Sequence, residues 1–259
     1  MEVPIKTLTI TIIFLWILLI AFSISVAYSV KDLDFSFGKL NMKTSKDGFL
    51  MFSLPLKIVN KGYYNIASLN FSTRILVGEN FASNVQSTYV PVIGKGEEKI
   101  VNHNITINVN RLVEENQKYL FNDTSIIVSV FLGMKLAELI PVQASTNISM
   151  PWGAPLYNFT LEEPIYSHFN ETHLKITVPI NFQNHAVFDV NGSIHVDMYD
   201  NRSVFLGDGQ TTLNVPSGSN FQAFIEFYVK AEAQAKSGFF KVYFQTAYFN
   251  YGPMVFRYG

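Results

Sequence analysis

The residue types that most often perform acid–base or metal chemistry are sparse in this chain. It has no cysteine, which excludes disulfides, thiolate nucleophiles and Cys-ligated metal centres. No two histidines have the four-residue spacing of a zinc-binding helix, and none stands in a His-Glu-x-x-His pattern. We therefore expect ordinary strand and loop histidines. The five histidines are His103, His168, His173, His185 and His195.

Two acidic groups have residue types that could bind Ca²⁺ or transfer protons. The first comprises Asp197, Asp200, Asn201 and Asp208, close to Gly207 and Gly209. Their spacing is not that of an EF-hand loop, and turn formation is the simpler interpretation. In the second group, Glu162 and Glu163 are adjacent and would point to opposite faces of a strand. We expect no catalytic residue, metal site or cofactor.

Aromatic side chains crowd the C-terminal segment and could form a contact surface. Along the expected strand 239–249, one face would carry Phe239, Tyr243 and Phe249. The other face would carry Phe240, Phe244 and Tyr248. Two interpretations stay open: an aromatic core with tyrosines at its edges, or an exposed patch for a protein or glycan partner. The candidate contact residues are Phe239, Tyr243, Phe249, Tyr251 and Tyr258.

The chain also carries many potential N-glycosylation sites. The Asn-x-Ser/Thr pattern begins at Asn70, Asn104, Asn122, Asn147, Asn158, Asn170, Asn191 and Asn201. None of these sites lies in the apolar N-terminal segment. We expect several to be glycosylated on an exported protein. The alternative is that β-proteins use asparagine and threonine in turns and on solvent-facing strand positions.

The composition is that of a folded protein without a nucleic-acid partner. Of 259 residues, 15% are charged and 15% are aromatic, whereas disordered chains are highly charged and poor in aromatics. The net charge is −1, which gives no electrostatic attraction to phosphate backbones. We expect no nucleic acid as a partner.

Residues 7–30 contain no charged side chain and predict a transmembrane signal-anchor. At ~1.5 Å per residue, 24 helical residues reach roughly 36 Å, which is enough to cross a hydrocarbon core of about 30 Å. Residues 1–6 would be a short cytoplasmic N-terminus, and the bulk of the chain would be extracytoplasmic at the cell membrane. The alternative is secretion after cleavage following Ala27, because Ser25 and Ala27 are small.

After the anchor, the chain repeats its own pattern. Residues 50–60 and 174–184 share an alternation of apolar residues at an offset of 124, with Pro55 matching Pro179 and Asn60 matching Asn184. Period-2 alternation is typical of a half-buried strand. A second match, of 101–109 with 221–229, has an offset of 120 and aligns His103 with Ala223. The repetition predicts a duplicated domain.

The expected architecture is mainly β. An N-terminal transmembrane helix would precede two tandem antiparallel β-sandwich domains, immunoglobulin-like and each with a short helix, at residues 31–150 and 156–259. The helices would lie near 111–121 and 230–236. Between the domains, the Pro- and Gly-rich segment 151–155 would be a stiff linker.

The order of these expected elements resembles a known family. It runs from a Pro-containing strand ending in Asn60 through an aromatic-aliphatic strand, a Gly-rich turn, a long strand and a short helix to a closing hairpin at 129–143. This order is similar to that of the late-embryogenesis-abundant type-2 domain, also called the water-stress and hypersensitive response (WHy) domain. The resemblance covers 32–259 in two copies and looks like the tandem, membrane-anchored archaeal type. It implies a seven-stranded sandwich with a helix, a stress-related or envelope role, and no enzyme activity.

Together these observations predict a membrane-anchored surface glycoprotein without catalysis. Its role would be structural or adhesive, with the lipid bilayer contacted through residues 7–30 and other surface proteins or glycans as partners. The alternative is an extracytoplasmic binding module that holds a lipid, glycan or peptide within or between the sandwiches.

Overall fold

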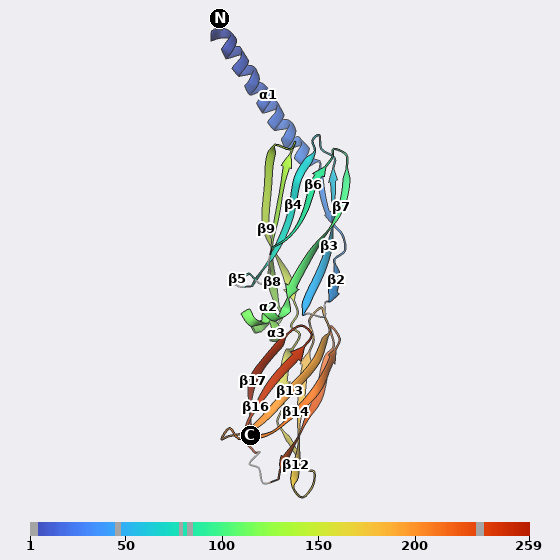
Figure 1. Cartoon of the computed structure of the whole chain (residues 1–259), viewed down its shortest axis with the longest axis vertical. Helices are drawn as coiled ribbons and strands as arrows, with labels where there is room; N and C mark the ends of the chain where they lie inside the picture. The colour runs from blue at the N-terminus through green and yellow to red at the C-terminus, as the bar shows by residue number, and fades with distance from the viewer. Residues whose placement is uncertain (1–4, 45–47, 78–79, 82–84, 232–235) are drawn as a thin grey trace.

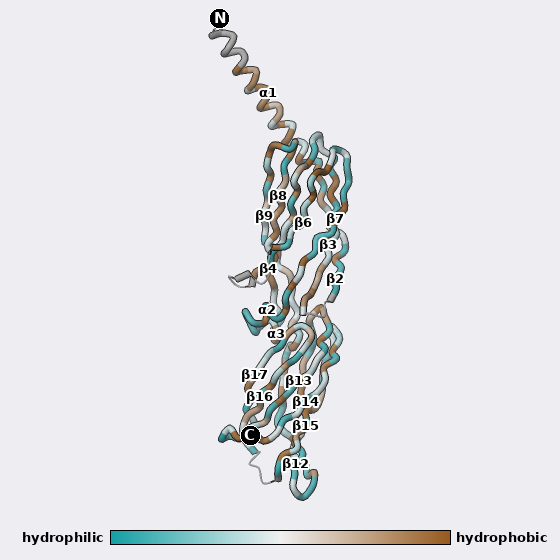
Figure 2. Tube along the Cα trace, viewed as in Figure 1, coloured by the Kyte–Doolittle hydropathy of each residue, from teal (hydrophilic) through white to brown (hydrophobic). Residues whose placement is uncertain are grey.

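The computed structural model describes the whole chain except residues 1–4, 45–47, 78–79, 82–84 and 232–235. Helix α1 (Ile5–Lys31) lies at one end of an elongated molecule, and two β-sandwiches follow it along the long axis (Figure 1). The helix is predominantly apolar along its described length, whereas the strands mix apolar and polar residues (Figure 2). The prediction of a mainly β chain with an apolar N-terminal helix is therefore confirmed.

The first sandwich packs two antiparallel sheets against each other. In the first sheet, β3 (Phe49–Asn60) lies between β7 (Glu98–Asn108) and two short strands placed end to end, β1 (Leu33–Phe37) and β2 (Asn41–Thr44). The second sheet has the order β6-β4-β8-β9, and β5 also pairs with β4. Its strands are β4 (Ile66–Val77), β5 (Asn80–Phe81), β6 (Gln86–Ile93), β8 (Thr124–Leu136) and β9 (Ile140–Trp152).

The second sandwich repeats this arrangement. In its first sheet, β12 (His173–Gln183) lies between β15 (Asn220–Lys230) and the short strands β10 (Tyr157–Leu161) and β11 (Ile165–His168). Its second sheet has the order β14-β13-β16-β17. These strands are β13 (Val190–Asp200), β14 (Phe205–Val215), β16 (Gly238–Thr246) and β17 (Asn250–Tyr258).

In both sandwiches the matching proline faces the gap between the two short strands that pair with its own strand. The Pro55 carbonyl accepts a hydrogen bond from the Gly38 amide at 2.8 Å, between β1 and β2. The Pro179 carbonyl accepts one from the Glu162 amide at 3.0 Å, between β10 and β11. Since proline cannot donate to a ladder, it fits where the neighbouring strand is interrupted.

The two matching asparagines form an identical buried corner. Asn60 Nδ2 donates to the carbonyls of Tyr64, Ile93 and Gly94, and Asn60 Oδ1 accepts from the Gly62 amide. Asn184 Nδ2 donates in the same way to the carbonyls of Phe188, Val215 and Pro216, and its Oδ1 accepts from the Ala186 amide. Both side chains are fully buried. Each ties the end of a central strand to two loops.

One predicted alignment within the repeat is wrong by two residues. Register pairs Pro55 with Asn102 and Pro179 with Phe224, which gives β7 and β15 an offset of 122 rather than 120. The counterpart of His103 is therefore Ile225 and not Ala223. A two-residue slip keeps every side chain on its own face, so apolar alternation alone cannot detect it.

The predicted helices and linker differ in detail from the structure. The segment 111–121 forms two helices, α2 (Val109–Glu115) and α3 (Lys118–Phe121), separated at Asn116 and Gln117. The helix predicted at 230–236 falls largely on residues outside the described ranges, and Lys230 itself ends β15.

The segment 151–155, expected as a stiff linker, packs between the two sandwiches: Trp152, Ala154 and Pro155 are buried, Gly153 is half-buried and Pro151 is exposed. Pro151 and Trp152 belong to β9. Trp152 Nε1 donates to the Tyr119 carbonyl at 2.9 Å, and its ring lies 6.1 Å from that of Phe188 in the second sandwich. One apolar cluster continues from the first sandwich into the second through this contact.

Candidate functional site

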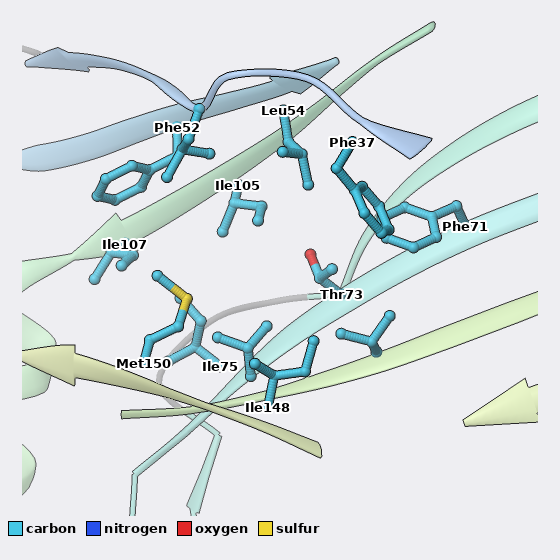
Figure 3. Close-up of a pocket in the computed structure, with 13 residues that line it drawn as sticks. Phe37, Phe52, Leu54, Phe71, Thr73, Ile75, Ile105, Ile107, Ile148 and Met150 are labelled. Atoms are coloured by element: carbon cyan, nitrogen blue, oxygen red, sulfur yellow. The ribbon is translucent and has the colours of Figure 1, made fainter. Parts of the chain in front are cut away.

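An apolar cavity of about 230 Å³ lies between the two sheets of the first sandwich. Figure 3 shows side chains from both sheets pointing into it. It lies between the two apolar clusters of the molecule: Phe52 and Ile75 belong to the cluster shared with the second sandwich, whereas Phe71 belongs to the cluster nearest α1. The lining comprises Phe37, Leu40, Phe52, Leu54, Phe71, Thr73, Ile75, Ile105, Ile107, Val128, Val130, Ile148 and Met150.

The cavity opens to solvent at the edge of the sandwich. Phe37 at the end of β1 is 58% exposed, Leu40 before β2 is 40% exposed, and Ile148 on β9 is 49% exposed. By contrast, Ile75 and Ile107 at its deep wall are almost fully buried. A ligand could therefore enter past these exposed apolar side chains without displacing the sheets.

Comparison of the two sandwiches shows why side chains do not fill this cavity in the first. Ile75 pairs with Val128, which pairs with Ile148; in the second sandwich Met198 pairs with Phe240, which pairs with Phe256. Four lining positions are thus aliphatic in the first sandwich and aromatic in the second. Ile105, Val128, Ile148 and Met150 correspond to Phe227, Phe240, Phe256 and Tyr258.

Those aromatic rings fill the equivalent space in the second sandwich. Phe227 and Phe240 stack at 5.7 Å, and Phe240 and Tyr258 lie 4.6 Å apart. At two other lining positions the first sandwich has the aromatic residue and the second the aliphatic one: Phe37 and Phe52 correspond to Leu161 and Ile176. The Phe37 ring is mostly exposed at the opening, so it fills little of the centre.

The one polar side chain in the lining is Thr73, whose hydroxyl is already used. Its Oγ1 lies 2.8 Å from Nε2 of His103, and His103 Nδ1 lies 2.9 Å from Oγ1 of Thr88. His103 is fully buried, and burial lowers the pKa of its imidazole. These three residues form a closed polar set behind the wall, so the cavity presents an apolar surface to a ligand.

The histidines and acidic residues that could have performed chemistry either have structural roles or lie far from one another. His185 joins the two sandwiches: its Nδ1 lies 2.7 Å from Oδ2 of Asp123. The Asp200 carboxylate accepts hydrogen bonds from the amides of Arg202 and Val204, and chiefly the bond from Val204 lowers the pKa of Asp200. Within the described residues, no group of three or more His, Asp or Glu side chains is arranged to hold a metal ion.

The candidate aromatic contact surface does not form one exposed patch. Phe249 and Tyr258 are buried, which corrects their assignment to it. Tyr258 packs on Phe240 and donates its hydroxyl to the Tyr199 carbonyl, and burial raises the pKa of that hydroxyl. Tyr251 packs on Phe121 of the first sandwich. Of the five residues, Phe239 and Tyr243 lie half-buried on the outer face of β16.

The sequon asparagines are mostly accessible. Seven of them are exposed: Asn104, Asn122, Asn147, Asn158, Asn170, Asn191 and Asn201. Asn70 is half-buried in β4, and its Oδ1 is enclosed without a hydrogen-bond partner. Asn70 is therefore the least accessible of the eight candidates.

These features define a two-sandwich protein with an apolar N-terminal helix and an apolar cavity. No protein-family model matches the sequence, and no curated protein matches it significantly. Among solved structures, it is similar to a crystal structure of red sea bream transglutaminase, with 12% identity and a TM-score of 0.30. The alignment covers 85% of this chain and 30% of that chain. At this score the likeness supports no inference about fold or activity.

Sequence reasoning missed the cavity residues for a specific reason. The usable signal was the exchange of aliphatic for aromatic residues between the copies, such as Val128 for Phe240. Detecting it requires the correct offset for β7 and β15 and the pairing of β9 with β17 as counterparts. Alternation settles neither of these, because it repeats every two residues.

Proposed function

We propose that α1 anchors this chain in a membrane and that the first sandwich binds an apolar ligand, such as an alkyl chain. The observation that carries the proposal is the open apolar cavity between β3, β7, β4, β8 and β9. The two sandwiches would be held outside the cytoplasm, where exposed sequons could be glycosylated. We further propose that the chain is a tandem WHy-type protein, which would bind its ligand close to the membrane in which α1 is anchored.

An uncleaved α1 is supported by the packing of its last turns. Val26 and Ser29 are buried against the first sandwich, and Val26 is part of its apolar cluster. Tyr64 contacts the helix twice, through a 2.6 Å hydrogen bond to Ser25 and through its ring, 5.7 Å from that of Phe22. Cleavage after Ala27 would remove Phe22, Ser25 and Val26 and expose the apolar residues beneath them.

The lining selects the ligand class. Sugar hydroxyls and peptide amides lose hydrogen bonds to water on entering a site, and an apolar wall returns none of them. An alkyl group loses nothing of this kind and gains from leaving water. The volume exceeds the roughly 150 Å³ of a cavity known to bind benzene and is below the ~300 Å³ at which typical small-molecule sites begin. It fits part of a chain, with any polar head outside Phe37 and Leu40.

The test uses the full chain in phosphatidylcholine nanodiscs and radiolabelled decanoate in equilibrium dialysis, with empty nanodiscs as background. We expect saturable binding above that background. Val128→Phe places the aromatic residue of the second sandwich into the cavity and should weaken binding at least ten-fold. Ile127→Phe is the matched control, because Ile127 is adjacent on β8 and is 41% exposed. Equal retention by wild type, Val128→Phe and empty nanodiscs would refute the proposal.

A structural or adhesive role is a second candidate, which one observation favours. Among the described strands, β9 pairs only with β8, and most of its thirteen residues are exposed. An open strand edge can pair with another chain. Because the chain lacks cysteine, a single Ser145→Cys variant can report such pairing by cross-linking on the membrane. A discrete product with Ser145→Cys but not with Asn201→Cys would support it, and the same products from both would contradict it.

A further inference from the structure

The last two turns of α1 present a buried stripe to the first sandwich. Phe22, Ser25, Val26 and Ser29 have the 3–4-residue spacing of one helix face and are partly or fully buried. The loop between β3 and β4, residues 61–65, covers this stripe. Its Tyr63 amide donates to Ser29 Oγ at 2.9 Å. The helix therefore enters the sandwich without a flexible spacer.

Helix length fixes how far the bilayer reaches along this stripe. The apolar run begins at Thr7, and a hydrocarbon core of about 30 Å takes ~20 helical residues at 1.5 Å each. Counted from Thr7, the core ends near Val26. Phe22 and Ser25 then lie at or inside the outer hydrocarbon boundary, and Tyr64, which contacts both, lies beside them. Any tilt of α1 draws the sandwich deeper.

Three loops meet at this end of the sandwich around one residue. Asn65 Oδ1 accepts from the Lys95 amide at 3.1 Å, and the Asn65 carbonyl accepts from the Ala137 amide at 3.0 Å. These bonds join loops 61–65, 94–97 and 137–139 into a continuous surface, here called the membrane rim. Figure 1 shows the hairpin ends beside the point where α1 enters.

The membrane rim has the chemistry of a lipid-headgroup contact. Leu139 is 75% exposed and Tyr63 is 61% exposed. Lys95 Nζ lies 5.6 Å above the Tyr63 ring in the rim, and on α1 itself Lys31 Nζ lies 5.0 Å above the Tyr28 ring. Aromatic rings and lysines with long apolar stems concentrate where headgroups meet hydrocarbon. Glu97 and Glu138 balance Lys61 and Lys95, so the rim suits zwitterionic lipid.

We propose that the membrane rim lies in the headgroup layer of the bilayer and holds the first sandwich against the lipid surface. This inference rests on the proposed anchoring by α1. The headgroup layers add roughly 5–7 Å on each side of the hydrocarbon core. The buried stripe on α1 already reaches the hydrocarbon core. The rim loops packed against this stripe must therefore lie within the headgroup layer. The bilayer is the one occupant, and contact requires no partner protein.

The experiment measures immersion depth in the full chain. Single cysteines carrying a nitroxide are placed at Leu139, at Phe169 and at Leu15, in phosphatidylcholine vesicles. Phe169 is 55% exposed between β11 and β12, in the second sandwich, and serves as the aqueous control. Leu15, on α1, is the control for the anchor. Collisions with oxygen, which concentrates in lipid, are compared with collisions with a water-soluble nickel complex.

The proposal predicts an oxygen-to-nickel ratio at Leu139 several-fold above that at Phe169 and below that at Leu15. If Leu139 matches Phe169 while Leu15 is in lipid, the anchor holds and the rim inference is wrong. If Leu15 itself reads as aqueous, the anchoring proposal fails instead. A Leu139 label shielded from both reagents would indicate burial against another protein copy, which also overturns the inference.

Discussion

Replacing Asn60 by alanine should destabilise the first sandwich selectively. The side chain is fully buried and makes contacts with three carbonyl oxygens and one amide. An amide group has two N–H donors, so at most two of its bonds to carbonyls are strong at once, plus the bond that Oδ1 accepts. At about 1 kcal/mol net for each bond, with a further cost for groups left unpaired in the interior, the loss is about 2–4 kcal/mol.

That free energy corresponds to a roughly 30- to 700-fold rise in the equilibrium constant for opening. Hydrogen-exchange mass spectrometry of the full chain in nanodiscs measures it, because peptides from β3 and β7 report on the first sandwich and peptides from β12 and β15 on the second. Asn184→Ala should produce the mirror result, since Asn184 makes the same set of bonds. The exposed Asn104→Ala variant is the control and should change stability by less than ~0.5 kcal/mol.

Asn60→Asp tests whether the donors are what matters. Aspartate keeps the acceptor for the Gly62 amide but removes both N–H donors and places a carboxylate against three carbonyl oxygens. It should therefore cost more than alanine. The reasoning would be refuted if Asn60→Ala behaved like Asn104→Ala, or if Asn60→Asp were tolerated.

Three further predictions follow from single sites. Burial lowers the pKa of His103 below its ordinary 6.5, so as the pH falls this histidine is protonated in the unfolded chain before it is protonated in the folded one. The first sandwich should therefore lose protection from hydrogen exchange below about pH 6.5, and His103→Ile, which introduces the counterpart residue Ile225, should abolish that loss. A Cβ at position 153 would overlap the His185 carbonyl, so Gly153→Ala should increase exchange on both sides of the sandwich contact, and unchanged exchange would contradict this. Val128→Phe should raise the unfolding free energy of the first sandwich by about 1 kcal/mol by filling the cavity, and a clear loss would mean that the space cannot accept a ring.

Much of the fold was predictable because local chemistry and strand alternation agree. The alternating segments 50–60 and 174–184 form β3 and β12 to within one residue at each end, and the matching Pro55 and Pro179 identified the duplication correctly. Turn, proline and alternation signals are local, so one sequence suffices to read them.

The remaining features depend on contacts between distant segments. The apolar run of α1 gave no sign that Val26 and Ser29 would be buried, because their neighbours up to Val30 are uncharged and mostly apolar, as in a membrane span. The burial of Tyr258 depends on which face of β17 meets the opposite sheet, whereas Phe249 is buried in the turn between β16 and β17 and lies on no strand face. Such outcomes are decided by packing partners far away in the sequence.

The duplication allows the packing of the two copies to be compared position by position. The second sandwich fills its centre with Phe227, Phe240, Phe256 and Tyr258, and burial of these large rings stabilises its core. The first sandwich has the same strand order and the same buried asparagine corner, so its cavity is not a consequence of the fold. A cavity of this kind weakens a core by roughly 24 cal/mol per Å³ when empty. A copy that retains such a space beside an opening at its edge, in the half of the molecule that carries α1, is what the proposed binding of an apolar ligand would require.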